Sequence, residues 1–125
     1  MNRLIVAISL LLAGSVSALA ETADVSTLKG SYSIWEDFEG GKVCPIQLDD
    51  GTTIGGFALE GDDQCMQTFK FDGDPAAWFV DDEGWLVLID ATRKILVRLA
   101  PSTDGAFYAN RTADGLESLN LTPER

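Results

Sequence analysis

The sequence contains no histidine, only nine lysine and arginine residues and only two cysteines in a chain of 125 residues. Without histidine, the chain cannot build a Ser-His-Asp or Cys-His catalytic site, an HExxH zinc site or an imidazole general base. The nine basic residues face 20 acidic ones, which gives a formal net charge of −11 at pH 7. Because nucleic-acid binding needs clustered lysine and arginine to contact phosphates, we expect no nucleic-acid partner.

Long hydrophobic runs are also scarce, and the main one lies near the N-terminus. The apolar segment 4–13 is too short to span a bilayer, which needs about 20 residues. It follows a single positive charge at Arg3 and precedes the sequence Ala-Leu-Ala at 18–20, which fits a signal peptidase site. We therefore predict that residues 1–20 are a cleavable signal peptide and that the mature chain begins at Glu21, with no membrane attachment after cleavage. A short N-terminal membrane anchor is the alternative.

The two cysteines, Cys44 and Cys65, both remain in the mature chain. An even number of cysteines in an exported protein indicates a disulfide bond. Closing a loop of about 20 residues stabilises a fold by roughly 3 kcal/mol, a large share of the about 5–15 kcal/mol typical of a domain. The alternative is a pair of free thiols for chemistry or metal binding. It fits poorly, because no histidine or third cysteine completes a zinc site and the spacing is not CxxC.

What the mature chain does contain is a series of short strand-like runs separated by glycine and aspartate. Their spacing of about ten residues predicts eight or nine strands. Asp-Gly steps between the runs favour tight hairpins, because glycine accepts the positive φ that such turns require. The only helix expected is one short turn over residues 24–28, with Asp24 as its N-cap. The predicted strands are 30–36, 42–48, 53–59, 67–71, 77–80, 85–89, 95–99, 106–109 and 118–121, and the Asp-Gly steps are at 50–51, 72–73, 104–105 and 114–115.

Consecutive strands with short connections predict an all-β domain over residues 28–125, with no internal boundary. A small eight-stranded antiparallel up-and-down barrel is the first choice, because closing the sheet removes its exposed edges; a sandwich is the second. A barrel of this size is filled by side chains or holds one small ligand. The bulky side chains expected to fill it are Phe57, Phe69, Phe71, Leu86, Leu88, Leu96 and Val97.

Three stretches, taken in order, resemble a known family. Residues 28–34 read Leu-Lys-Gly-Ser-Tyr-Ser-Ile, and residues 56–65 read Gly-Phe-Ala-Leu-Glu-Gly-Asp-Asp-Gln-Cys, with Cys44 upstream. Residues 77–84 begin with Ala-Trp and end with a glycine that precedes an apolar strand. This pattern resembles the bacterial alkaline proteinase inhibitors, which are periplasmic inhibitors of secreted serralysin-type zinc metalloproteases. The likeness covers residues 28 to about 100, most of the mature chain.

The resemblance implies a lipocalin-like barrel with one disulfide between Cys44 and Cys65, and a periplasmic inhibitor rather than an enzyme. In that family the mature N-terminal segment threads into the protease cleft and places its terminal amine near the catalytic zinc. The matching segment here is the N-terminal trunk, residues 21–27, in which Ser26 and Thr27 connect to the barrel. The expected partner is a secreted zinc metalloprotease in a 1:1 complex with a monomer that carries no cofactor or metal. The residues expected to bind the protease are Glu21, Thr22, Ala23, Asp24 and Val25.

Two other function classes remain open. A lipocalin-like carrier would bind a small molecule inside the barrel, although the bulky interior residues argue against it. A hydrolase would need a pair of carboxylates, but the acidic groups lie at predicted turns, where aspartate is expected for its backbone hydrogen bonds. These groups are residues 49–50, 62–63 and 81–83. The three tryptophans, Trp35, Trp78 and Trp85, are assigned to packing in the core and at the barrel ends, with a binding surface as the alternative.

Overall fold

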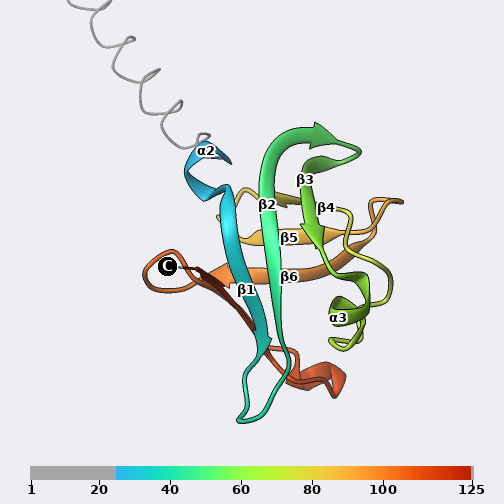
Figure 1. Ribbon diagram of the computed structural model, residues 1–125, viewed down its shortest axis with the longest axis vertical. Coiled ribbons are helices and arrows are strands. Elements are labelled where there is room, and N and C mark those ends of the chain that lie inside the picture. The colour runs from blue at the N-terminus through green and yellow to red at the C-terminus, as the bar shows by residue number, and fades with distance from the viewer. Residues whose placement is uncertain (1–24, 125) are drawn as a thin grey trace, which may run out of the picture.

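The computed structural model of the chain describes residues 25–124 (Figure 1). Its eight strands form one closed antiparallel barrel in sequence order, in which β1 also pairs with β8. The prediction of an all-β, eight-stranded up-and-down barrel is therefore confirmed. The strands are β1 (Gly30–Glu36), β2 (Val43–Thr53), β3 (Gly56–Gly61), β4 (Ala77–Val80), β5 (Leu86–Ile89), β6 (Ile95–Pro101), β7 (Phe107–Ala109) and β8 (Leu119–Pro123). The short helices are α2 (Val25–Leu28), α3 (Asp63–Gln67) and the 3-10 turn η1 (Thr112–Asp114).

Alternation along the strands decides which side chains enter the barrel. In β1, Tyr32 and Ile34 are buried, while the serines beside them face outward. Ile34 lies opposite Cys44 of β2 and Leu121 of β8, and both of these partners are fully buried. Because cross-strand partners share a face of the sheet, this row forms one layer of the core. The pairing of β1 with β8 completes the sheet, so neither of these strands is left as a free edge.

The interior is filled by large apolar side chains, as predicted. Trp78 and Phe69 are its largest fully buried members, and their relative exposure is 0%. Of the seven side chains expected inside, Phe69, Leu86, Leu88 and Val97 are buried in this core, and Phe57 and Phe71 pack against it. The prediction that Leu96 lies inside the barrel is wrong. In β6 the buried residues are Val97 and Leu99, so alternation places Leu96 on the outer face.

A second, smaller apolar cluster lies on the outer face of β4 and β5. Ala77, Val87 and Ile89 are buried there, and Phe79 packs against them. β5 is consequently buried on both faces, since Leu86 and Leu88 point into the barrel. This explains why its sequence is continuously apolar instead of alternating.

One predicted strand, residues 67–71, does not exist. Gln67 ends α3, and the chain then turns through Lys70, whose φ is +62°. Helix α3 begins at Asp63 because the Asp62 side chain caps it. This side chain accepts hydrogen bonds from the backbone N–H groups of Gln64 and Cys65. The alternation of Phe69 and Phe71 with polar residues predicts a strand. The structure places both rings on an irregular segment, where Phe69 is buried in the core and Phe71 packs against it.

The predicted turn at Asp50-Gly51 is also wrong, because β2 continues through it to Thr53 with an irregular register between Leu48 and Thr52. The hairpin instead turns at Ile54-Gly55, where Gly55 has a φ of +80°. The predicted turn at 104–105 is confirmed, with positive φ at both residues. A helical turn over 25–28 is confirmed too, with the Lys29 N–H donating to the Val25 carbonyl at 3.0 Å, whereas its expected cap Asp24 lies outside the described residues. Within residues 25–124, no helix combines the length and apolar character needed to cross a bilayer.

Candidate functional site

The alternating strand directions sort the connections of the barrel into two ends. At one end, called the α2 end, α2 enters β1 together with the connections 81–85 and 102–106. The 54–55 turn lies instead beside Ile89 and Arg93. At the other, called the α3 end, lie the connections 37–42, 62–76, 90–94 and 110–118.

Helix α2 fastens the start of the described chain to the mouth of the barrel (Figure 1). Val25 and Leu28 are half-buried and pack against the core. The Tyr32 hydroxyl donates to the Leu28 carbonyl at 2.6 Å, and burial raises the pKa of this phenol, so it stays protonated. Lys29 also pairs with Asp50 of β2 at 3.1 Å, although both groups are half-exposed. The predicted trunk residue Val25 is therefore held by the barrel.

The other predicted trunk residues, Glu21, Thr22, Ala23 and Asp24, lie outside the described residues. Their assignment to protease binding, like that of Val25, stays a prediction. The predicted connection at Ser26-Thr27 is part of the helical turn α2.

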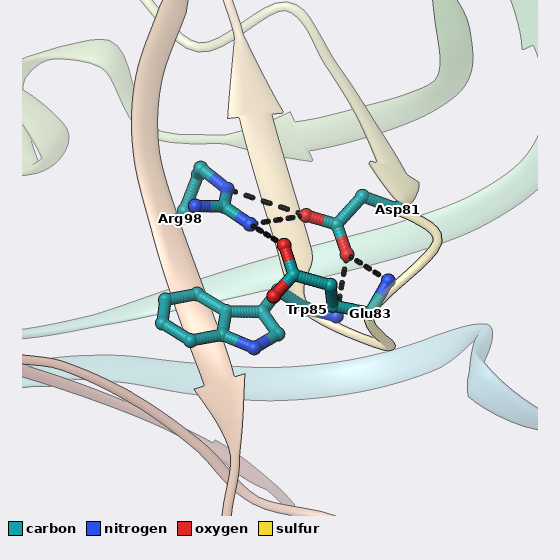
Figure 2. A network of polar contacts seen from close by, with 4 residues as sticks. All are labelled: Asp81, Glu83, Trp85 and Arg98. Carbon is teal, nitrogen blue, oxygen red and sulfur yellow. Dashed lines mark hydrogen bonds and ion pairs between the residues drawn. The ribbon is translucent and has the colours of Figure 1, made fainter.

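The β4–β5 turn at the α2 end is organised around one carboxylate (Figure 2). The first Asp81 oxygen accepts hydrogen bonds from the backbone N–H groups of Glu83 at 2.9 Å and Trp85 at 3.0 Å. The second accepts from the Arg98 guanidinium of β6, at 3.2 Å from Nε and 2.6 Å from Nη2. These hydrogen bonds, led by that of Arg98, lower the pKa of Asp81, and the Asp81 hydrogen bond raises that of Arg98.

Arg98 also holds the indole ring of Trp85. Its guanidinium carbon lies 4.5 Å from the ring centroid, a cation–π arrangement, and its Nη2 reaches Glu83 at 3.2 Å (Figure 2). The guanidinium is thus shared between two acidic side chains and one aromatic face. The alternative of a binding-surface role stays open for Trp85, which is partly exposed.

The other two tryptophans have clearer structural roles. Trp78 is fully buried, and its indole N–H donates to the carbonyls of Asp49 at 2.9 Å and Ala58 at 3.0 Å. Trp35 is partly exposed on the outer face of β1, and its N–H donates to the Thr122 hydroxyl at 3.2 Å. The packing interpretation of the tryptophans therefore holds for Trp78.

The acidic groups considered for hydrolysis serve local structure. Asp81 organises a turn, Asp62 caps α3, and Asp50 pairs with Lys29. Among residues 25–124, no three acidic or cysteine side chains gather in a way that would hold a metal ion. The arrangement is that of turn and cap residues.

A groove of about 360 Å³ lies on the outer surface of β1, β2 and β3. Its polar lining includes Ser31, Gln47, Glu60 and Glu124, which face away from the core. It is a surface depression outside the barrel, not the internal cavity that a lipocalin-like carrier would use. The interior position of such a cavity is occupied by Trp78 and the side chains around it.

The α3 end is closed by covalent and buried polar contacts. A disulfide joins Cys44 of β2 to Cys65 of α3, as predicted. Arg111 is only 7% exposed and donates to the carbonyls of Phe69 and Glu117, both at 2.7 Å. Burial lowers the pKa of this guanidinium. Sequence reasoning missed both Arg111 and Arg98, because a single arginine in a loop or on a strand gives no sign of its distant partners.

Comparison with known proteins identifies the family. A profile described as "Protease inhibitor Inh" matches residues 23–121. The chain belongs to the protease inhibitor Inh family. The Inh fold is also found in a solved structure titled "Crystal structure of a psychrophilic marine protease MP inhibitor", with a TM-score of 0.65 and 15% sequence identity. That match covers 82% of this chain and 100% of the other. No curated protein matches significantly.

Membership in the Inh family establishes the general role. The chain acts as a protease inhibitor, its partner is a protease, and the family indicates an inhibitor in place of an enzyme. The resemblance seen in the sequence to bacterial protease inhibitors is thereby confirmed.

Proposed function

We propose that the mature protein is a periplasmic inhibitor of a secreted serralysin-type zinc metalloprotease. In this proposal residues 21–24 enter the active-site cleft, Val25 stays packed on the barrel, and the terminal amine of Glu21 approaches the catalytic zinc. The complex has 1:1 stoichiometry, because one barrel carries one such segment. The observation that carries the proposal is the anchoring of α2 at the barrel mouth, directly after the predicted segment.

The anchoring supports this mechanism through its effect on binding entropy. With Val25 packed on the core and Tyr32 holding Leu28, the segment starts from a fixed point on a rigid body. A fixed attachment reduces the freedom that must be lost when the segment is bound. An extended segment can add to the cleft as a strand, and a free amine can occupy the open position of a catalytic zinc.

Export supports the same mechanism. Cleavage after Ala20 would both place the protein in the periplasm and create the amine at Glu21. A shift of the cleavage site by one residue would move the amine by about 3.3 Å, enough to remove it from a metal-ligand distance. Correct processing is therefore part of the inhibitory function.

The first prediction tests this segment. A serralysin-type zinc metalloprotease is titrated with the mature protein starting at Glu21 and with a variant lacking residues 21–24. The deletion should weaken inhibition by at least about 100-fold, because it removes the zinc-directed amine and the strand-like contacts. Its thermal unfolding midpoint should fall by no more than about 8 °C, because the deletion ends before α2 and removes only its expected cap, Asp24.

A matched control keeps every residue but blocks the amine. A version with Glu21 preceded by a short Gly-Ser extension should inhibit as weakly as the deletion. Equal potency of all three proteins would contradict insertion of the N-terminus, and lack of inhibition by the mature protein would exclude this class of target.

A further inference from the structure

The distance between the predicted mature N-terminus and its anchor limits where the protease can lie. Only Glu21 to Asp24 precede α2 in the predicted mature chain, and four residues reach at most about 14 Å. For the amine of Glu21 to approach a zinc ion inside a cleft, the rim of that cleft must come close to the α2 end. If the proposed function holds, the connections at this end face the protease.

The β4–β5 turn differs from the other connections at this end in how firmly it is held. The two oxygens of Asp81 accept hydrogen bonds from two backbone N–H groups of the turn and from Arg98 on a neighbouring strand. Asp81 keeps only 20% of its side chain exposed, and Arg98 keeps 38%. A turn fixed in this way loses little conformational freedom on binding.

The turn also presents a side chain with unused binding capacity. Trp35 and Trp78 both use their indole N–H groups in hydrogen bonds. Trp85 is the one tryptophan whose N–H has no partner among residues 25–124, although the ring is fixed by Arg98 on one face (Figure 2). This N–H group is not buried, so it is open to solvent or to a partner.

We propose that Trp85, backed by Arg98, is a second anchor that contacts the protease beside its cleft. Trp and Arg are the side chains most enriched at the energetic centres of protein interfaces. The matching surface on the protease is a shallow apolar patch that receives the ring and offers a carbonyl or carboxylate oxygen to the indole N–H. The contact between this patch and Trp85 supplements the contact made by residues 21–24.

The experiment compares Trp85→Ala with Trp35→Ala in the titration described above. Both side chains are partly exposed tryptophans on the outer barrel surface, but Trp35 pairs with Val43 and Asn120 near the α3 end. We expect Trp85→Ala to raise the inhibition constant by about 30-fold. Trp35→Ala should leave it unchanged, and the unfolding midpoint of each variant is measured alongside.

A further variant, Trp85→Phe, keeps an aromatic ring on Arg98 and removes only the indole N–H. Its inhibition constant should fall between those of the wild type and Trp85→Ala. Wild-type potency in both Trp85 variants would overturn the second anchor while leaving the role of residues 21–24 intact. Loss of potency in Trp35→Ala equal to that in Trp85→Ala would overturn it too, because the effect would not be specific to the α2 end. Failure of the wild type to inhibit would remove the proposed function, and the anchor with it.

Discussion

The two ends of the barrel differ in the contacts that hold them. At the α3 end, the disulfide, the buried Phe69 and the buried guanidinium of Arg111 tie together segments that are distant in sequence. The α2 end carries the half-buried apolar groups of α2 and a separate charged turn with an open indole N–H. The α3 end is thus held by covalent and buried contacts, and the α2 end is the one at which we propose contact with the protease.

This separation has a physical reason. A binding end must leave apolar and polar groups incompletely satisfied, because those groups form their contacts only with the partner. Groups left open in this way add little to the stability of the free protein. In a small domain the missing stability has to come from elsewhere, and a disulfide and a well-packed aromatic ring at the opposite end supply it.

The largest expected effect comes from the paired substitution Cys44→Ser and Cys65→Ser. Opening a disulfide across a sequence separation of 21 should reduce the free energy of unfolding by about 3 kcal/mol. For a domain of this size that lowers the unfolding midpoint by roughly 12–24 °C. Calorimetry measures the shift, and reductant added to the wild type should reproduce it. Inhibition measured below the unfolding transition should be unchanged. A loss of inhibition as great as that caused by the N-terminal deletion would contradict the assignment of protease contact to the α2 end alone.

A smaller effect is expected from Arg111→Lys. Lysine keeps the charge but cannot donate to the carbonyls of both Phe69 and Glu117 in the geometry of the guanidinium. The buried carbonyl left without a partner should cost about 2 kcal/mol. Urea unfolding measures the change, with the exposed Arg93→Lys as a control. Unaltered stability would show that the buried arginine does not hold the α3 end together.

The smallest stability effect concerns acid sensitivity, and it compares one turn carboxylate at each end. Hydrogen bonds lower the pKa of Asp81, chiefly that from Arg98, and the pKa of Asp90, chiefly that from Thr92. A carboxyl with a lowered folded pKa stabilises the fold fully above its unfolded pKa of about 4. This contribution is lost as the pH falls through the folded pKa.

Asp81→Asn and Asp90→Asn should therefore each reduce the difference in stability between about pH 7 and about pH 3. Only Asp81→Asn should also weaken inhibition, because Asp81 holds the turn that carries Trp85. Urea unfolding at the two pH values and protease titration at neutral pH separate these effects. Equal inhibition by both variants would remove the link between the Asp81 network and binding.

Much of the barrel could be predicted from local sequence patterns. Short alternating runs gave the positions of most strands, because alternation directly reflects which face of a strand is buried. The failures occurred where a distant contact outweighed the local pattern. Residues 67–71 alternate like a strand, yet a capped helix, a disulfide and a buried arginine fix them in another shape. The prediction of a turn at Asp50-Gly51 is wrong because β2 pairs with β3 as far as Thr53.

The candidate site was predictable only in part. The family pattern pointed to the N-terminal segment, and the chain's place in the Inh family confirms an inhibitor. Nothing in the local sequence distinguished Trp85 from Trp35, since each lies at or next to one end of a predicted strand. Their difference depends on Arg98 of β6, which lies 13 residues after Trp85 and 17 residues after Asp81.

The sequence alone determined that this is a small, acidic, histidine-free β protein with one disulfide pairing and the pattern of a protease inhibitor. These properties depend on composition, spacing and alternation, which act over a few residues. The tertiary structure decided which end carries α2, which arginine is buried and which indole keeps its N–H open. Those features arise from contacts such as Arg111 to Phe69, 42 positions apart, which form only when the barrel closes.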